Sequence, residues 1–266
     1  MNYGFIGAGN MAGAIIKGMT VGSGSFEGRD IFVYDLNASA AKSLADICKV
    51  NVCSSAEDVI ASSDVLVLAV KPNVLPDVVT QLKNKIIEKS PLVISIAAGK
   101  TLEFLEGLIA KDFPIVRVMP NINAKVGCAT SAFCTTETVS DEQKAIVKKL
   151  FSTVGAVTEL SEKMFSIHSV IGGAAPAFAY LYIDALSRAA VKAGMPKKQA
   201  LELTAQTVLG SAKMVLESGE HPWELIDQVC SPGGTTIEGV CSLEANGFET
   251  ALCKAFDAVY EKDKRL

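Results

Sequence analysis

Three small residues near the start of the chain have the spacing of a phosphate-binding turn. They are Gly7, Gly9 and Ala12 of the segment Gly7-Ala8-Gly9-Asn10-Met11-Ala12, which follows an apolar run and precedes a helix-like stretch. In a GxGxxA turn the first glycine permits the tight bend and the second lets the backbone approach a pyrophosphate. The small third residue packs the helix closely on the strand. The pattern therefore predicts a dinucleotide held at a helix N-terminus, and an ordinary glycine-rich turn is the alternative.

Asp35 ends the second apolar run, about where dinucleotide-binding proteins carry an acidic residue. A carboxylate there accepts a hydrogen bond from the adenosine ribose 2′-hydroxyl and repels a 2′-phosphate, which favours NAD(H). No arginine follows it, since the next basic residue is Lys42, and Arg29 precedes the strand. The alternative is that Asp35 simply caps the following helix. The sequence therefore leaves the choice between NADH and NADPH open.

A second segment suited to ligand binding is Ser231-Pro232-Gly233-Gly234-Thr235-Thr236-Ile237-Glu238. Thr235 and Glu238 have the spacing of a capping box, which predicts that a helix starts here. Gly233 and Gly234 bring no side chains, so the backbone amides at the helix start stay accessible to a carboxylate. A plain helix cap without a ligand is the alternative.

Metal and histidine chemistry have little support in the sequence. The only histidines, His168 and His221, lie in unrelated contexts, and we interpret them as an interior or interface residue and a turn residue. No Cys-x-x-Cys occurs, so we expect no metal site, and the odd number of cysteines favours free thiols in a reducing cytoplasm. The seven cysteines are at positions 48, 53, 128, 134, 230, 241 and 253.

The composition is that of a globular protein rich in aliphatic residues. Of the 266 residues, 49% are hydrophobic and 20% are charged, and the net charge is −4. This charge offers no basic face for nucleic acid. No apolar run reaches the roughly 18 residues of a membrane helix. With a mean hydropathy of +0.32, the chain has more apolar residues than a small monomer hides, which indicates an oligomer. A first strand starting at Asn2 leaves no room for a cleaved presequence, so we expect a cytoplasmic protein.

Short apolar runs alternate with helix-like stretches through the first 160 residues, as expected of a doubly wound α/β sheet. The predicted strands are 3–6, 31–34, 65–70, 92–96 and 115–118, and the predicted helices are 11–19, 38–48, 73–89 and 101–110. Two later runs, near 130–134 and 155–158, extend the sheet around a helix near 140–151.

Strand patterns stop after residue 161, where the sequence becomes helical. Pro176 suits the first turn of a helix that continues to Ala193. Further helices are predicted at about 197–218, 235–245 and 248–263. The chain is therefore expected to have a Rossmann-type dinucleotide-binding domain at 1–160 and an all-α domain at 161–266.

A set of short motifs along the whole chain then resembles one enzyme family, the pyrroline-5-carboxylate reductases. The segment Cys230–Glu238 is highly specific for that family, whereas the first turn is shared by many related reductases. The motifs are Phe5–Met11, Ala69–Pro72, Ser95–Gly99, Arg117–Asn121, Gly210–Met214, Gly219–Pro222 and Cys230–Glu238.

The resemblance implies an oxidoreductase of proline biosynthesis. It would transfer a hydride from NADPH or NADH to the C=N bond of L-1-pyrroline-5-carboxylate and release L-proline. A cyclic imine is basic enough to be largely protonated near neutral pH. The enzyme would mainly have to align C5 of the ring with C4 of the nicotinamide, without a strong acid. The resemblance also implies that the helical domain forms a homodimer and that dimers assemble into a decamer.

The same resemblance assigns site residues. The substrate carboxylate would bind backbone amides at Gly233, Gly234 and Thr235, with the catalytic Thr236 hydroxyl near the ring nitrogen, and Glu162 matches a family position near the substrate. The residues expected to bind the cofactor are Ile6, Gly7, Ala8, Gly9, Asn10, Met11, Asp35, Ala69, Val70, Lys71, Pro72 and Ala97.

The chain departs from the family pattern in three places. The chain has Gly172-Gly173-Ala174-Ala175-Pro176 where Ser-Gly-Ser-Gly-Pro is usual, and Ile122-Asn123 where Thr-Pro is usual. Ala56 stands where an asparagine often meets the adenosine ribose. These changes affect the hydrogen bonding expected around the site.

Two other functions compete with this interpretation. A β-hydroxyacid dehydrogenase would need a catalytic lysine in the first helix after the domain boundary, where only Lys163 occurs. A non-catalytic dinucleotide sensor would bind the cofactor but show no turnover. Replacing Thr236 by alanine separates a sensor from a reductase, because only a reductase has turnover to lose.

Overall fold

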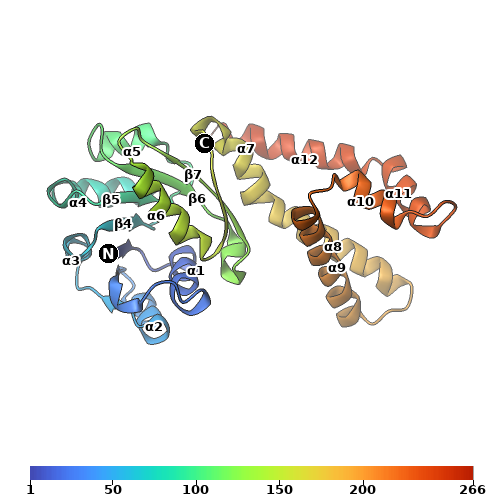
Figure 1. Cartoon of the computed structure of the whole chain (residues 1–266), viewed down its shortest axis with the longest axis horizontal. Coiled ribbons are helices and arrows are strands. Elements are labelled where there is room, and N and C mark those ends of the chain that lie inside the picture. Colours follow the sequence, from blue (N-terminus) through green and yellow to red (C-terminus); the bar gives the residue numbers. More distant parts are fainter. Residues whose placement is uncertain (266) are drawn as a thin grey trace. The chain divides into compact units, whose positions relative to one another are not determined.

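The computed structural model of the protein describes residues 1–265, which form two compact units (Figure 1). Residues 1–173 form the sheet unit and residues 174–265 form the helical unit. The predicted domain boundary at residue 160 lies earlier in the chain than this division. Residues 161–173 make several of their polar contacts with the sheet unit, as described below for Glu162, His168 and Gly172.

The sheet unit is built on eight strands in the order β3-β2-β1-β4-β5-β6-β7-β8. The first six strands in this order are parallel, β7 runs antiparallel to β6, and β8 is parallel to β7. This arrangement confirms the predicted α/β class and the extension of the sheet by two later strands. The strands are β1 Tyr3–Ile6, β2 Ile31–Tyr34, β3 Asn51–Val52, β4 Val65–Leu68, β5 Leu92–Ser95, β6 Ile115–Met119, β7 Ala129–Thr135 and β8 Gly155–Glu159.

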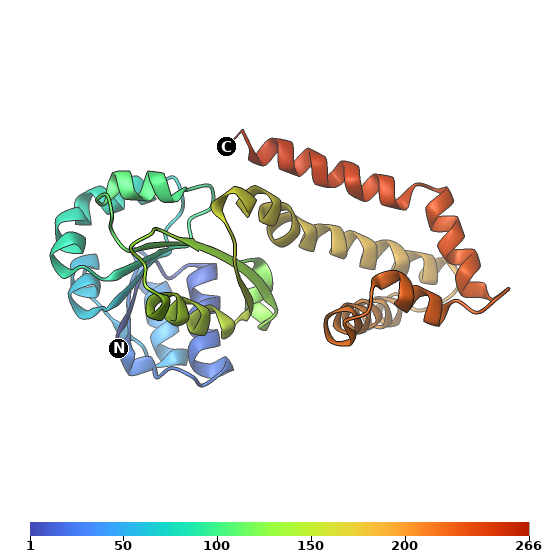
Figure 2. The same ribbon diagram turned by 45° about the horizontal axis from the view of Figure 1, so that its top comes forward.

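Helices cover both faces of the sheet, which explains the unbroken apolar runs of the central strands (Figures 1 and 2). Every residue of β1, β4 and β5 is buried. One hydrophobic core includes side chains of α1, α2 and α6, and a second includes side chains of α3, α4 and α5. The helices are α1 Asn10–Lys17, α2 Ala38–Cys48, α3 Ala56–Ser62, α4 Leu75–Lys89, α5 Leu102–Leu108 and α6 Asp141–Ser152.

Several of the predicted cofactor residues follow the carboxyl ends of the parallel strands. Gly7 follows β1, Asp35 follows β2, Ala69 follows β4 and Ala97 lies two residues after β5. In an open α/β sheet ligands bind at this edge. The topology therefore brings most of the predicted cofactor residues to one edge of the sheet.

The helical unit contains no strand within its described residues. Its helices are α8 Ala175–Lys192, α9 Lys197–Ser218, α10 Pro222–Val229, α11 Thr235–Ala245 and α12 Phe248–Asp263. Pro176 lies in the first turn of α8, as predicted. Three short helical segments precede α8: η4 Glu162–Met164, α7 Phe165–His168 and the π-helical turn η5 Ser169–Ala174.

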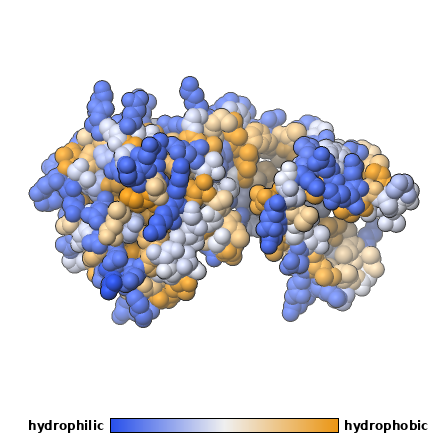
Figure 3. Space-filling view, viewed as in Figure 1, coloured by the Kyte–Doolittle hydropathy of each residue, from blue (hydrophilic) through white to orange (hydrophobic). Residues whose placement is uncertain are grey.

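The helical unit lacks a hydrophobic core of its own. Only Pro176, Ser187, Ala200 and Thr204 are buried in residues 174–265. Large apolar side chains are instead exposed along α8 and α9, among them Leu181 at 69% and Leu216 at 84%. Apolar side chains are visible on the helical unit in the space-filling view of Figure 3.

One helical stretch, Glu162–Lys192, is long and apolar enough to cross a membrane by length and composition alone. Only 11% of its most apolar window is buried. An apolar surface that is so exposed to water fits either a lipid or a protein partner. The same stretch belongs to the segment predicted to form the dimer.

One strand and two α-helices were not predicted from the sequence. The two-residue strand β3 and the helix α3 were not predicted, and residues after His221 were interpreted as a connecting loop although they form α10. His221 is the N-cap of that helix: its Nδ1 accepts a hydrogen bond from the Trp223 amide at 3.3 Å, and Glu224 completes a capping box.

Candidate active site

The first turn has the geometry that the GxGxxA pattern predicts. Gly7 has φ +108°, a backbone conformation that residues other than glycine rarely adopt. A Cβ atom at Gly7 would lie 2.6 Å from the Ala69 carbonyl oxygen, so the turn packs directly on the chain leaving β4. The Gly7 amide donates a hydrogen bond to the Tyr34 carbonyl at 2.8 Å. Gly7 is thus required by the fold itself.

Gly9 has a different role, because its neighbourhood is open. A Cβ atom there would meet nothing within 4 Å. Gly9 is the N-cap of α1, no side chain caps this helix, and its first turn contains no acidic residue. The first amides of a helix lack intrahelical partners, so this N-terminus is free to bind an anion approaching across Gly9. The turn therefore fits the pyrophosphate of a dinucleotide.

Asp35 links the turn to the chain after β2. Its Oδ2 accepts a hydrogen bond from the Ala8 amide at 2.6 Å, and its Oδ1 accepts one from the Asn37 amide at 2.8 Å. The N-cap of α2 is Asn37, so the alternative of Asp35 as the helix cap is wrong. A carboxylate has about four acceptor positions, so Asp35 can still accept hydrogen bonds from a ligand.

Two hollows adjoin this turn. A cleft of about 360 Å³ is lined by Ile6, Gly7, Asp35 and Val70, together with residues from the starts of α3 and α4. Of the remaining predicted cofactor residues, Ala8, Gly9 and Asn10 line the second hollow, and the others line neither: Met11, Ala69, Lys71, Pro72 and Ala97. Ala97 is buried in the same core cluster as Ile6. The structure thus gathers four of the predicted residues around one cleft.

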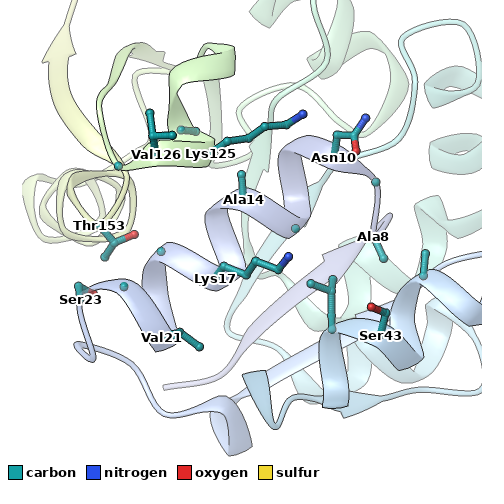
Figure 4. Close-up of a pocket in the computed structure, with 18 of the residues that line it drawn as sticks. Ala8, Asn10, Ala14, Lys17, Val21, Ser23, Ser43, Lys125, Val126 and Thr153 are labelled. Carbon is teal, nitrogen blue, oxygen red and sulfur yellow. The ribbon is translucent and has the colours of Figure 1, made fainter. Parts of the chain in front are cut away.

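The second hollow is a groove of about 1020 Å³ along α1, shown in Figure 4. Ala8, Gly9 and Asn10 lie at one end of it. Lys17 and Lys125 also line it, and in Figure 4 both side chains point toward the end where Ala8 and Asn10 lie. No Asp or Glu is among its lining residues, so the groove is electropositive.

Glu162 is held by the sheet unit. Its Oε1 accepts hydrogen bonds from the Arg117 guanidinium and from the Leu102 amide, each at 2.8 Å. Leu102 is the first residue of α5, and the Arg117 guanidinium also lies over the Phe165 ring at 4.4 Å from its centroid. The pKa of the nearby Cys134 thiol is raised to about 12, mainly by burial and to a smaller extent by the negative charge of Glu162. The arrangement shows a structural role for Glu162, and its predicted contact with substrate stays a prediction.

Sequence reasoning missed Arg117 and Asn121 as individual residues of this region. The Asn121 side chain donates a hydrogen bond to the Gly172 carbonyl at 2.9 Å and accepts one from the Thr130 amide at 3.3 Å. Arg117 is the only charged residue of the apolar strand Ile115–Met119. Because a buried charge needs an opposite charge beside it, this pattern could have indicated a carboxylate partner.

The departure at Gly172 has a steric explanation. A Cβ atom at Gly172 would lie 2.9 Å from the His168 ring. The His168 Nε2 lies 3.1 Å from the Met119 carbonyl, and burial lowers the pKa of this histidine. His168 is thus a satisfied buried residue, as predicted.

The predicted substrate segment begins a helix, but without the predicted capping box. The N-cap of α11 is Gly234, no side chain caps the helix, and Thr235 and Thr236 are its first two residues. The capping-box prediction was wrong because Thr235 already lies within the helix. Gly233 has φ +68°, and a Cβ atom at Gly234 would lie 2.4 Å from the Ser231 Oγ. The α11 N-terminus is therefore more open to an anion than the sequence indicated.

The two candidate sites belong to different units. The cofactor residues and Glu162 lie in the sheet unit, and Gly233 to Thr236 lie in the helical unit. Residues 1–265 contain no group of three or more His, Cys, Asp or Glu arranged to hold a metal ion. All seven cysteines are free thiols.

Two family models match the chain. One, described as pyrroline-5-carboxylate reductase dimerisation, matches residues 162–266. The other, described as NADP oxidoreductase coenzyme F420-dependent, matches residues 2–99. The two matches correspond to the all-helical part of the chain and to the strands around the dinucleotide turn.

Curated relatives are similar over the full length. The pyrroline-5-carboxylate reductase of Escherichia coli is 41% identical over 99% of this chain and 97% of its own. That of Arabidopsis thaliana is 40% identical over 99% of this chain and 94% of its own.

Solved structures have the same fold. A pyrroline-5-carboxylate reductase from Coxiella burnetii superposes with a TM-score of 0.94 at 33% identity, covering 99% of this chain and 97% of that one. A pyrroline carboxylate reductase of Plasmodium falciparum with NADP bound gives a TM-score of 0.86 at 32% identity, covering 100% and 97%. With its dinucleotide turn, its uncapped α11 and these full-length matches, the chain belongs to the pyrroline-5-carboxylate reductase family.

Proposed function

We propose that this protein is an NAD(P)H-dependent reductase that converts L-1-pyrroline-5-carboxylate to L-proline. The observation that carries the proposal is the presence, in one chain, of two uncapped helix starts that are each suited to an anion. α1 begins behind Gly9 and α11 begins behind Gly234, and neither helix has a side-chain cap. The first start suits the pyrophosphate of a cofactor, and the second suits the carboxylate of a small substrate.

The cofactor would be held by the edge of the sheet. The α1 amides behind Gly9 would bind the pyrophosphate, and Asp35 would accept hydrogen bonds from the adenosine ribose. Val70, Lys71 and Ala97 would line the ribose and nicotinamide end. Bound there, NADH or NADPH supplies the hydride.

The substrate would be held by the start of α11. Amides at Gly233, Gly234 and Thr235 would bind its carboxylate, with the Thr236 hydroxyl near the ring nitrogen. The imine brings its own proton near neutral pH, so the chain's residues need only orient the ring and exclude water. The proposal gives His168 no part in the reaction, since its ring is buried and hydrogen-bonded to the Met119 carbonyl.

The proposed assembly is a homodimer formed by the helical segment 161–266, with dimers assembled into a decamer in the cytoplasm. The many large apolar side chains exposed along α8 and α9, among them Leu181 and Leu216, support a protein partner. The ion pair between Asp184 and Arg188 at 2.7 Å lies within the same apolar stretch of α8, and charges there favour a protein partner over lipid.

The activity is tested with purified protein, pyrroline-5-carboxylate and each reduced cofactor. We expect oxidation of at least one cofactor and formation of proline. Thr236→Ala should lower kcat strongly without changing cofactor affinity, whereas Thr236→Ser keeps a hydroxyl and should retain most of the rate. Thr158→Ala, an exposed change on β8, is the matched control. Absence of turnover with both cofactors would reject the proposal.

The assembly is tested by light scattering on a sizing column. Leu181→Glu places a charge on the exposed apolar face of α8 and should release monomers or abolish soluble expression. Val21→Glu alters an apolar residue that is about equally exposed, at 66%, in the sheet unit and should leave the assembly intact. A monomeric wild-type protein would contradict the proposed dimer.

A further inference from the structure

The cleft beside the dinucleotide turn carries an unusual charge for a site that receives phosphates. Besides Asp35, its lining includes Glu57 and Asp77, and no Lys, Arg or His is among the lining residues. Glu57 lies in the first turn of α3 and Asp77 in the first turn of α4. Three carboxylates therefore surround one cleft of about 360 Å³.

These carboxylates are not neutralised by neighbours. Within residues 1–265, none of the three forms an ion pair with a lysine or arginine. Asp35 is fixed by two uncharged amide donors, from Ala8 and Asn37. The negative charge in the cleft thus remains available to act on a ligand.

The adenosine end of the cofactor is the part that would enter this cleft. Its walls are apolar where β1 ends and α4 begins, at Ile6, Val74 and Val78, which suits a flat base. A ribose with free 2′- and 3′-hydroxyls donates hydrogen bonds to carboxylates. A 2′-phosphate carries close to two negative charges and only accepts them.

The basic residues nearest to Asp35 in sequence do not line the cleft, so they are poorly placed to offset its negative charge. Arg29 precedes β2, and its Nε pairs with Glu27 at 2.8 Å. Lys42 follows within α2 but lines neither hollow. Lys17 and Lys125 line the other hollow, the groove along α1.

We propose that Asp35, Glu57 and Asp77 together make this chain select NADH over NADPH. The proposal rests on the proposed function only in taking the cleft as the adenosine site. An acidic residue after β2 is usual in NADH-binding proteins. Here two further carboxylates, one from α3 and one from α4, would also repel the 2′-phosphate of NADPH.

The test measures binding of each reduced cofactor to the intact oligomer, by calorimetry and by nicotinamide fluorescence, without substrate. The wild-type protein should bind NADH at least about tenfold more tightly than NADPH. The Glu57→Gln, Asp77→Asn double variant should tighten NADPH binding about tenfold and change NADH binding less than about twofold. Added salt should reduce the wild-type preference, because it screens exposed charges.

Glu88→Gln is the matched control, since Glu88 lies at the far end of α4 and outside the cleft. It should leave the ratio of the two affinities unchanged. Equal or tighter binding of NADPH to the wild-type protein would overturn the proposal. If Lys17→Ala then abolished that preference, the 2′-phosphate would lie in the groove along α1. A protein that prefers NADH in binding but reduces no pyrroline-5-carboxylate would contradict the proposed function and leave this inference standing.

Discussion

Replacing Arg117 by methionine should destabilise the sheet unit through the carboxylate that is left behind. The Arg117 side chain is 12% exposed and that of Glu162 is 31% exposed, so most of the pair is shielded from water. Methionine fills similar volume over Phe165 but removes the charge. Glu162 would keep one hydrogen bond, from the Leu102 amide, and lose its cation.

The magnitude follows from that burial. Removing one partner of a buried ion pair costs about 3–5 kcal/mol, and the partial access of Glu162 to water places this pair near the lower value. For a chain of this size, about 3 kcal/mol lowers Tm by roughly 6–12 °C. The exposed Lys85–Glu88 pair is the control, and Lys85→Met should shift Tm by no more than about 2 °C.

The assay is thermal unfolding at fixed protein concentration for Arg117→Met, Glu162→Gln and the double variant. The double variant should lose clearly less stability than the two single losses added together, because each single change leaves the other group unpaired. The reasoning is refuted if Arg117→Met behaves like Lys85→Met, or if the two single losses add.

Three further predictions concern separate residues. Gly9→Ala should fold normally yet bind NADH much more weakly in fluorescence titrations. Gly7→Ala should also lower Tm, because its Cβ would clash with the backbone at Ala69. Equal Tm values for the two variants would count against this. Burial lowers the pKa of His168 in the native protein, so on acidification the unfolded chain is protonated at this residue first. The stability of the native protein should therefore fall as the pH drops below about 6.5. His168→Gln should reduce that acid-side loss in Tm measured against pH, and an unchanged profile would contradict it. With its pKa raised to about 12, Cys134 should resist thiol reagents at pH 8 in the native protein, while the exposed Cys128 reacts, as peptide mapping would show.

Local patterns in the sequence were sufficient for most of the fold. The parallel strands are buried on both faces, so each is an unbroken apolar run such as Val65–Leu68. The strand β3 has only two residues, both exposed, and so leaves no such pattern. The helix α10 was hidden because His221-Pro222 suggests a turn, although a proline in the first turn and a capping residue before it also start helices.

The site was predictable only where it is local. The turn at Gly7 and Gly9 depends on backbone geometry within six residues, and spacing reveals it. The pairing of Arg117 with Glu162 joins residues 45 positions apart, which depends on how strands and helices pack. At the start of α11 a local pattern was misleading. Thr235 and Glu238 have the spacing of a capping box, but the N-cap residue is Gly234.

The shortage of buried residues in the helical unit has a consequence for how the protein is made. A segment with four buried residues cannot by itself offset the conformational entropy of ordering five helices. In the proposed homodimer it would gain its stability on meeting another copy. Folding of α8 to α12 and subunit association would then be one reaction, second order in chain concentration. Tm should rise with protein concentration, and mature subunits should exchange only as slowly as they unfold.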